Sequence, residues 1–336
     1  MLAGLAEAGS EHTIVAFAPT GLRGSRHVAD ALAGLPIETR ITSVPGAYYW
    51  RGIWTRLGRP PVERFVGSLD VFHYSDWMHP RQRGGIRTTT VHDLVPLRYR
   101  ELVHPRTYRL HASKLRDAVR TCDAIFANSA FTADDVASQL GYPRQRIHVA
   151  YPGVDPRFGS DGPRADLGAP YVLTVATNEP RKNLATLVDA FEIVRREQPD
   201  LLLAVAGGEA PRGTPGASGL GGDGVRALGF VPDDELAALY RGAEVFAYPS
   251  LFEGFGMPIV EALASGAPVV ASSHQSLDEA CGEHALRADP ADANAFAEAI
   301  RRALAGGAPP GGAAHARRFT WRACGDAVLR GYERAL

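Results

Sequence analysis

The chain has 336 residues, 45% of them hydrophobic, and by length it is expected to form two domains that each bury a core. Its 36 basic and 37 acidic residues leave a formal charge of −1, so it lacks the strong positive field that is typical of nucleic-acid-binding proteins. The three cysteines, Cys122, Cys281 and Cys324, are too far apart for a C-x-x-C metal or redox motif and odd in number for a disulfide framework. The composition therefore predicts a two-domain protein of a reducing compartment that binds no nucleic acid.

Two further features bear on location and chemistry. No run of the sequence reaches the roughly 18 apolar residues that span a bilayer, and the first residues lack the layout of a signal peptide, which predicts a cytoplasmic protein. Among the 36 basic residues only Lys114 and Lys182 are lysines. A lysine kept in so arginine-rich a chain hints at a role for a compact ammonium group.

Short apolar runs rich in β-branched residues alternate with amphipathic stretches of helical period along the whole chain. This alternation predicts an α/β protein in which helices cover both faces of parallel sheets. In the first half the expected strands are residues 13–19, 38–44, 70–75, 87–94, 124–129 and 147–151. In the second half they are residues 171–176, 201–206, 225–230, 245–249 and 268–272.

The order of these elements indicates the domains. Each half is expected to be a doubly wound, Rossmann-like domain, the first over residues 1–155 and the second over residues 166–318. Residues 152–170, with four prolines and four glycines, predict a linker. Residues 1–9 have the pattern of a helix end, so the strand and glycine turn that usually open such a domain are expected to be missing, which predicts a gap in the N-terminal sheet.

Histidines lie near the ends of two predicted strands in the first half. His92 and Asp93 belong to the run TTTVHDL of residues 88–94, and His73 lies near the end of the strand over residues 70–75. Ligands of open parallel sheets gather at the carboxyl ends of the strands, which makes these side chains candidates for substrate contact. The alternative for a lone histidine is a structural role.

Two stretches of the first half combine aromatic with basic residues. Residues 46–65 (GAYYWRGIWTRLGRPPVERF) hold two tyrosines, two tryptophans and four arginines, and residues 99–120 are basic with few acids. A helix of this kind can rest on an anionic membrane, or it can bury its aromatic rings and expose a solvated basic face. Both interpretations stay open, so peripheral membrane contact is a candidate.

The run VATNEPRKN, residues 175–183, ends a predicted strand and opens a helix. Arg181 and Lys182 at this point can neutralise the charge that builds up on a leaving diphosphate. The alternative, two solvated cations, is less attractive because cations oppose the helix dipole at a helix start.

Residues 249–272 (PSLFEGFGMPIVEALASGAPVVAS) carry the most chemistry. The loop that begins at Glu253 leads into a predicted helix with Pro258 in its first turn and Gly266 just past its end. Backbone amides of a glycine loop at a helix start favour an anion such as a diphosphate. Glu253 and Glu261 are ionised acceptors suited to sugar hydroxyls, one on the transferred sugar and one on the ribose. The alternative is an ordinary loop and helix with surface glutamates.

This string resembles the signature of the retaining glycosyltransferases of family four, which have the GT-B fold, and its two glutamates fit the E-x7-E motif of that family. The resemblance covers about residues 2–336. It implies retaining transfer from a nucleotide-diphosphate sugar, without a metal or a further cofactor, in a cleft between two domains. It also implies that the last helix, residues 319–336, crosses back to the N-terminal domain.

The resemblance also implies roles for individual residues. Lys182 matches the phosphate-binding lysine of the family, while Thr177 stands where an arginine is usual, so Arg181 of the E-P-R-K-N string is expected to supply the guanidinium. The catalytic candidates are His92, Arg181, Lys182 and Glu253. The donor-binding candidates are Gly254, Phe255, Gly256, Glu261 and, at the base, Phe230 and Val231. The acceptor-side candidates are His73 and Asp93.

No carboxylate in these motifs is an obvious nucleophile for a covalent intermediate. The family's proposed alternative is attack on the same face, with the leaving phosphate accepting the acceptor's proton, and the motifs contain no D-x-D metal pair. The E-P-R-K-N string suggests a mannose-like or deoxysugar donor. Two rival interpretations are a nucleotide-sugar epimerase of the same fold and a truncated nucleotide-sugar-binding protein without turnover.

Overall fold

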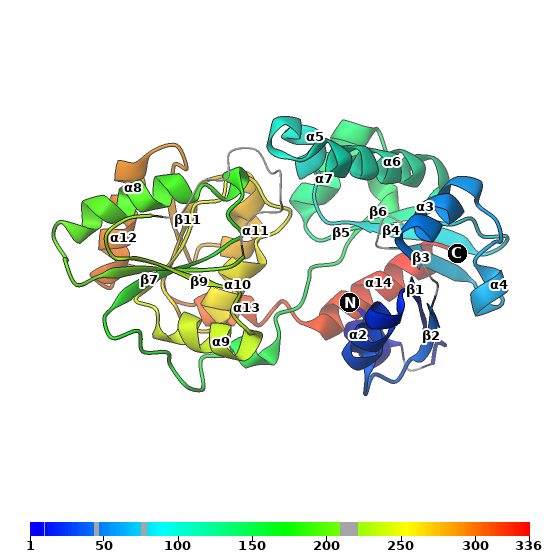
Figure 1. Cartoon of the computed structure of the whole chain (residues 1–336), viewed down its shortest axis with the longest axis horizontal. Coiled ribbons are helices and arrows are strands. Elements are labelled where there is room, and N and C mark those ends of the chain that lie inside the picture. Colours follow the sequence, from blue (N-terminus) through cyan, green and yellow to red (C-terminus); the bar gives the residue numbers. More distant parts are fainter. Residues whose placement is uncertain (10, 44–46, 75–78, 209–220) are drawn as a thin grey trace. The chain divides into compact units, whose positions relative to one another are not determined.

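The computed structural model describes residues 1–9, 11–43, 47–74, 79–208 and 221–336, with the backbone alone for residues 22–23, 43 and 47–51 (Figure 1). Its contacts divide the chain into two compact units. Unit 1 comprises Met1–His92, Arg109–Gly153 and Trp321–Leu336, and unit 2 comprises Asp93–Tyr108 and Val154–Thr320. The C-terminal helix is therefore part of unit 1.

Unit 1 carries two parallel sheets. One pairs β1 (Val15–Thr20) with β2 (Glu38–Ser43). The other has the order β3 (Val71–Tyr74), β4 (Ile86–Val91), β5 (Ala124–Ala127) and β6 (Ile147–Val149), which is also the order along the chain. The helices are α1 (Leu2–Ala8), α2 (Leu22–Leu32), α3 (Ala47–Leu57), α4 (Glu63–Val66), α6 (Pro105–Thr121), which begins in the segment grouped with unit 2, α7 (Ala130–Leu140) and α14 (Trp321–Ala335).

Helices α1 and α14 pack closely because glycines lie where their backbones meet. A methyl group on Gly4 would collide with the carbonyl of Trp321, and one on Gly325 would collide with the carbonyl of Gly4. Beneath them Leu5 and Val328 join a buried cluster with Phe126 of β5. The last helix thus completes part of the core of unit 1.

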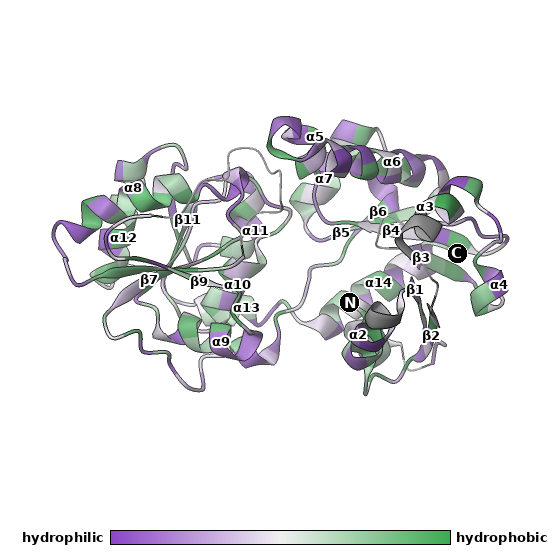
Figure 2. Cartoon of the chain, in the orientation of Figure 1, coloured by the Kyte–Doolittle hydropathy of each residue, from purple (hydrophilic) through white to green (hydrophobic). Residues whose placement is uncertain are grey.

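Unit 2 carries one continuous six-stranded parallel sheet of order β12-β11-β10-β7-β8-β9. Two buried apolar clusters, drawn from alternate residues of these strands, are covered by helices, as the green sides of the helices in Figure 2 show. The strands are β7 (Tyr171–Val175), β8 (Leu202–Ala206), β9 (Val225–Gly229), β10 (Val245–Tyr248), β11 (Val269–Ser272) and β12 (Leu286–Ala288). The helices include α5 (Val95–Arg98), α8 (Leu184–Arg195), α9 (Asp233–Gly242), α10 (Met257–Ala264), α11 (Asp278–Cys281), α12 (Ala293–Leu304) and α13 (Gly312–Ala316).

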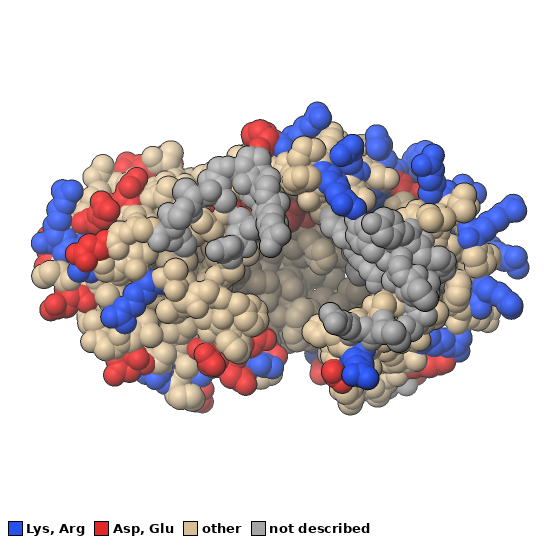
Figure 3. Space-filling model, viewed as in Figure 1, with Lys and Arg blue, Asp and Glu red and all other residues tan. Residues whose placement is uncertain are grey.

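The α/β class is confirmed, and every strand predicted from the sequence is present within a few residues of its expected bounds. Among the strands of the described residues, only the three-residue strand β12 was not predicted. No helix in the described part of the chain is both long and apolar enough to cross a membrane. Figure 3 shows acidic and basic side chains intermingled over unit 2, whereas basic ones predominate around α6.

The interpretation of residues 152–170 as a linker is wrong for most of that stretch. Phe158 is buried in unit 2, with its ring 5.8 Å from that of Tyr240. Ser265 Oγ donates to the Phe158 carbonyl at 2.8 Å, and Arg241 Nε donates to the Pro163 carbonyl at 2.7 Å. Proline and glycine indicate irregular backbone, but here an apolar anchor and satisfied carbonyls fix that backbone to a domain.

Candidate active site

The candidate site of unit 2 lies where the strand order reverses. Strand β7 is the first of its sheet along the chain and lies beside β10, with Val172 opposite Val245, while β8 and β9 extend the sheet on the other side. The loops after β7 and β10 therefore leave the same edge as neighbours. In open α/β sheets this switch point is where ligands bind.

The loop after β7 is tied to the loop after β10 by backbone contacts. Leu251 N donates to the Arg181 carbonyl at 2.8 Å, and Asn183 Nδ2 donates to the Pro249 carbonyl at 3.2 Å. Asn183 has φ 56°, the left-handed conformation that asparagine tolerates better than most residues, and it occupies the position just before the first residue of α8. These contacts hold Arg181 and Lys182 against the E-x7-E loop.

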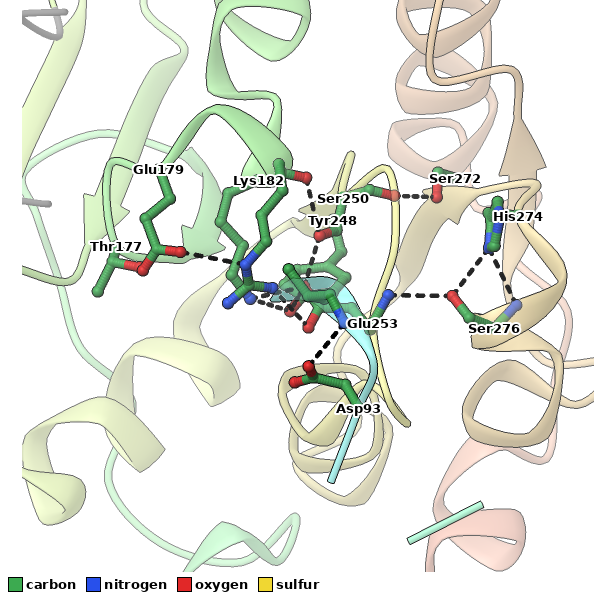
Figure 4. A network of polar contacts seen from close by, with 12 residues as sticks. Asp93, Thr177, Glu179, Lys182, Tyr248, Ser250, Glu253, Ser272, His274 and Ser276 are labelled. Carbon is green, nitrogen blue, oxygen red and sulfur yellow. Dashed lines mark hydrogen bonds and ion pairs between the residues drawn. The ribbon is translucent and has the colours of Figure 1, made fainter. Parts of the chain in front are cut away.

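Glu253 is the centre of a cluster of polar side chains (Figure 4). It accepts hydrogen bonds from Lys182 Nζ at 2.6 Å and Arg181 NH1 at 3.0 Å. It also accepts from Tyr248 Oη at 2.9 Å and Ser250 Oγ at 2.5 Å. The glutamate is only 9% exposed, so its carboxylate is satisfied by protein donors rather than by bulk water.

The charges of this cluster stabilise one another. Burial opposes ionisation of Glu253, but Lys182 and Arg181 outweigh it and lower the pKa of the carboxyl below its usual value. Burial likewise disfavours the charged form of Arg181, and here Glu253 and Glu179 outweigh it and raise the pKa of the guanidinium. At Lys182, by contrast, burial outweighs the charge of Glu253 and lowers the pKa of the ammonium group. The arrangement therefore favours the ionised forms of Glu253 and Arg181 away from bulk water.

The E-x7-E helix begins and ends as predicted. Helix α10 follows Gly256, which has φ 102°, with Pro258 in its first turn, and Gly266 beyond its end has φ 83°. Gly254 is buried at this helix start. Phe255 is also buried, with its ring 5.1 Å from that of Phe319, so its side chain belongs to the core, and contact of its backbone with a sugar donor stays a prediction.

Glu261 lies in α10 but not in the Glu253 cluster. Within the described residues its carboxylate accepts one hydrogen bond, at Oε2 from Tyr240 Oη of α9, at 3.0 Å. Burial raises the pKa of Glu261 to about 7, and the Tyr240 bond opposes that rise only in part. The second glutamate of the motif therefore changes its charge near neutral pH.

The base-side candidates lie at the end of β9. The Phe230 side chain is 83% exposed, and Val231 packs partly against the core. Exposure and packing do not test whether these two residues contact a nucleotide base, so this role stays a prediction.

The neighbouring candidates His92 and Asp93 from the first half of the chain are assigned to different units. His92 follows β4 directly and is exposed in unit 1, while Asp93 is grouped with unit 2 and accepts a hydrogen bond from Val95 N at 2.9 Å. Figure 4 shows Asp93 beside the Glu253 cluster. Burial raises the pKa of Asp93, and Arg181 offsets part of that rise.

Lys114, the second lysine of the chain, is buried in α6 and donates a hydrogen bond to the Thr90 carbonyl at 3.0 Å.

The structure gives no support to an acceptor-side role for His73. Its ring nitrogens lie 2.9 Å from Thr90 Oγ1 and 3.1 Å from Thr88 Oγ1, and its ring packs against Phe126 and Tyr332. Burial, followed by the charge of Lys114, lowers its pKa to about 3. Both ring nitrogens bond to side chains of the neighbouring strand, as the structural alternative expects, and contact with an acceptor stays a prediction.

Several residues of the site were not predicted. Tyr248 and Ser250 bind Glu253, Tyr240 binds Glu261, and Ser276 Oγ accepts a hydrogen bond from Glu253 N at 3.1 Å. Tyr248 and Ser250 could have been suspected because they lie at the end of the strand before the motif. Tyr240 and Ser276 have no sequence signal of this kind. In the described part of the chain, no group of three or more His, Cys, Asp or Glu side chains is placed to hold a metal ion.

Comparison with known proteins gives a consistent result. The family described as Glycosyltransferase Family 4 matches residues 1–158, and Glycosyl transferases group 1 matches residues 169–306. The chain is 31% identical over 271 residues to O-antigen chain mannosyltransferase B of Escherichia coli, a match that covers 73% of this chain and 69% of the relative. It is 31% identical over 202 residues to mannosylfructose-phosphate synthase of Agrobacterium fabrum, which covers 52% of this chain and 43% of the relative.

Solved structures agree on the fold. Sucrose-phosphate synthase from Thermosynechococcus elongatus superposes with a TM-score of 0.69 at 19% identity, over 96% of this chain and 98% of that one. Anabaena Alr3699/HepE, solved in complex with UDP and glucose, superposes with a TM-score of 0.64 at 17% identity, over 99% of this chain and 90% of that one. With the family matches and the E. coli relative, these findings show that the chain belongs to glycosyltransferase family 4 and has the GT-B fold.

Proposed function

We propose that this glycosyltransferase moves a mannose-like hexose or deoxyhexose from a nucleoside diphosphate sugar to a hydroxyl acceptor, with retention at the anomeric carbon. The observation that carries the proposal is the buried cluster of Arg181, Lys182 and Glu253 at the switch point of unit 2. The names of the relatives support the sugar class, since several of them are mannosyltransferases.

The cluster suits the departure of a diphosphate. Cleavage of the bond from the sugar C1 to the phosphate oxygen places negative charge on the leaving group, and cations held in a water-poor site stabilise such charge most strongly. Arg181 and Lys182 supply two cations whose positions are fixed by Glu253. The backbone at the start of α10, around Gly254 and Gly256, adds a helix N-terminus.

We propose that the leaving phosphate, and not a protein side chain, takes the proton of the acceptor hydroxyl. The acceptor oxygen bonds to C1 on the face that the phosphate oxygen leaves, and the acceptor's proton passes to that phosphate oxygen. The products are a glycoside and a nucleoside diphosphate, so atoms and charge balance without a protein base. We further propose that no metal ion or additional cofactor takes part, because Arg181 and Lys182 occupy the role of the neutralising charge.

Calorimetric titration with GDP, UDP and dTDP tests the proposal. We expect micromolar binding of one nucleotide, about tenfold or more weaker for Lys182→Ala and for Glu261→Ala. Glu192→Ala is the matched control, because Glu192 is an exposed residue of α8. If none of the three nucleotides binds the wild-type protein, the proposal fails.

Turnover separates the remaining rivals. An epimerase would convert a donor sugar without an acceptor, whereas a transferase releases nucleoside diphosphate in proportion to the glycoside formed. A protein that only binds would do neither. The relatives found by comparison are named as transferases or synthases, and this favours neither the epimerase nor the protein that only binds. Excess EDTA should leave the rate unchanged, and a rate restored only by a divalent cation would refute metal independence.

A separate proposal concerns an anionic membrane surface. Along α6 the exposed face presents arginines at helical spacing together with Leu110, and at the end of α3 the side chains of Ile53 and Leu57 are 56% and 66% exposed. The arginines are Arg106, Arg109, Arg116 and Arg120. Residue 46 of the aromatic stretch, and the side chains of residues 47–51, lie outside the described part of the chain. A basic face with apolar side chains matches an anionic lipid surface.

Vesicle flotation tests this contact. Vesicles that contain phosphatidylglycerol should carry the protein, and vesicles of phosphatidylcholine alone should not. Arg116→Glu/Arg120→Glu should abolish flotation, while Arg196→Glu/Arg302→Glu, the same charge change on exposed residues of unit 2, should not. Equal loss in both double variants would show that only net charge matters.

A further inference from the structure

The guanidinium of Arg181 lies between two carboxylates. Its Nε donates to Glu179 Oε2 at 3.1 Å, and its NH1 donates to Glu253 Oε2 at 3.0 Å. The Arg181 side chain is 19% exposed and that of Glu179 is 26% exposed. Because a guanidinium is planar, two acceptors on different nitrogens fix both its position and the orientation of its plane.

Glu179 is itself held by its own loop. Its Oε1 accepts a hydrogen bond from Thr177 Oγ1 at 2.7 Å, which leaves Oε2 directed at Arg181. The backbone closes around it, since Glu179 N donates to the Thr177 carbonyl at 2.7 Å and Lys182 N donates to the Glu179 carbonyl at 2.9 Å. A chain of contacts therefore runs from the end of β7 through Thr177 and Glu179 to Arg181.

Part of the guanidinium stays available. Within the described residues, NH2 of Arg181 donates no hydrogen bond, so its two N–H groups are left for a ligand. An arginine with only one anchor would lose far more side-chain freedom on binding an anion than one already held at two nitrogens.

A second carboxylate beside a diphosphate site has a cost. Glu179 adds a negative charge that repels the ligand, and this repulsion alone would weaken binding. Its retention next to Arg181 is understandable if orientation of the guanidinium is worth more than the repulsion. The two effects have opposite signs, which makes them separable by experiment.

We propose that Glu179 is a positioning residue, anchored by Thr177, that orients Arg181 for the diphosphate of the donor. The inference rests on the proposed function of the same site and adds to it a residue pair that does not itself touch the ligand. Glu179→Ala removes the acceptor and the charge together. Glu179→Gln keeps an acceptor oxygen for Arg181 Nε and removes only the charge.

Calorimetry with whichever of GDP, UDP and dTDP binds the wild-type protein provides the test. We expect Glu179→Ala to weaken the nucleotide about fivefold, Thr177→Val to weaken it about twofold, and Glu179→Gln to bind at least as tightly as the wild type. In the Arg181→Ala background, Glu179→Ala should cause no further weakening, because the residue acts through Arg181. Thermal unfolding should be similar in all single variants of Glu179 and Thr177, which excludes general loss of structure.

Each other outcome overturns the inference. Tighter binding by Glu179→Ala would mean that the carboxylate only repels the ligand. A loss in Glu179→Gln equal to that in Glu179→Ala would mean that charge, not orientation, matters. A fivefold loss that persists in Arg181→Ala would place the effect elsewhere. A wild-type protein that binds none of the nucleotides would instead refute the proposed function, so the two failures are distinguishable.

Discussion

The sheets of the two units differ in strand order, and this difference decides which predicted residues meet. In unit 2 the order reverses between β10 and β7, so loops that are about 70 residues apart in sequence leave the sheet as neighbours. In unit 1 the strands β3 to β6 follow one another in chain order, and β1 pairs with β2 in a second sheet. Within the described residues, neither sheet of unit 1 contains a reversal.

The consequence appears in the candidate residues. Arg181, Lys182 and Glu253 were chosen from separate motifs, and the reversal brings them into one cluster. His73 and His92 were chosen because they lie near strand ends, but His73 serves the packing of its own sheet and His92 is exposed at the end of β4. The position of a strand in the sheet order is thus more informative than the residue type that follows it.

The largest effect should come from Glu253, the residue on which the polar cluster of unit 2 is centred. Glu253→Gln leaves Arg181 and Lys182 buried without their shared counterion, so we expect the free energy of unfolding to fall by about 3 kcal/mol. Turnover should fall by about 100-fold or more. Urea unfolding and an assay of nucleoside diphosphate release measure both, with Glu192→Gln as the exposed control. Unchanged stability would mean that the cluster is not an ionised network.

The next effect sharpens the contrast between units. His92→Ala should lower kcat by about 100-fold and change nucleotide affinity by no more than about twofold, because the nucleotide contacts that we propose come from unit 2. His73→Ala should instead lower the stability of the fold. It removes two hydrogen bonds within unit 1 and should lower the free energy of unfolding by about 1–3 kcal/mol. A nucleotide affinity that falls with His92→Ala would break the proposed division of roles.

A smaller effect concerns pH and Glu261. Its pKa of about 7 means that the carboxylate gains a proton as the pH falls below neutrality. Ribose hydroxyls donate best to the ionised form, so nucleotide binding should weaken by about tenfold from pH 8 to pH 6. Glu261→Gln should lose this component and keep only the titration of the nucleotide itself. Equal pH profiles for the two proteins would contradict the assignment.

The raised pKa of Glu261 also predicts how the free energy of unfolding changes with pH. The folded-state pKa of Glu261, about 7, lies above the ordinary glutamate value of 4.5, so the unfolded chain binds fewer protons at this residue between those two pH values. The free energy of unfolding should therefore fall as pH rises from 4.5 to about 7, and Glu261→Gln should reduce that fall. Tyr240→Phe removes the bond that lowers this pKa and should move the upper limit to higher pH.

The smallest effect concerns the loop that brings the two motifs together. Asn183→Gly keeps the left-handed backbone but removes the bonds to the carbonyls of Pro249 and Pro290, and should cost about 1 kcal/mol of unfolding free energy. Asn183→Ala adds backbone strain and should cost about 1 kcal/mol more. Chemical denaturation measures both. An alanine variant as stable as the glycine variant would remove backbone conformation from the explanation.

Periodicity predicted the fold well and the site in part. Alternating apolar runs located the strands, and Pro258 with Gly266 located α10, because these signals are local in sequence. Strand β12 was missed because its three residues, with Arg287 in the middle, give no apolar run. The pairing of Glu253 with Arg181 and Lys182 could not be predicted from spacing, since it depends on the strand order. The same holds for Tyr240, which reaches Glu261 from another helix.

The burial of both lysines makes the protein an unusual target for amine chemistry. Lys114 lies in the core of unit 1, and the Lys182 side chain is 11% exposed within the Glu253 cluster. Reagents that acylate surface lysines should therefore leave both lysines of the folded chain almost unlabelled, and acylation of Lys182 should slow further when a nucleotide is bound. After denaturation a lysine-specific protease would cut the unmodified chain at two sites into three fragments. Because acylation blocks cleavage, the cut that is lost would report which lysine had been modified.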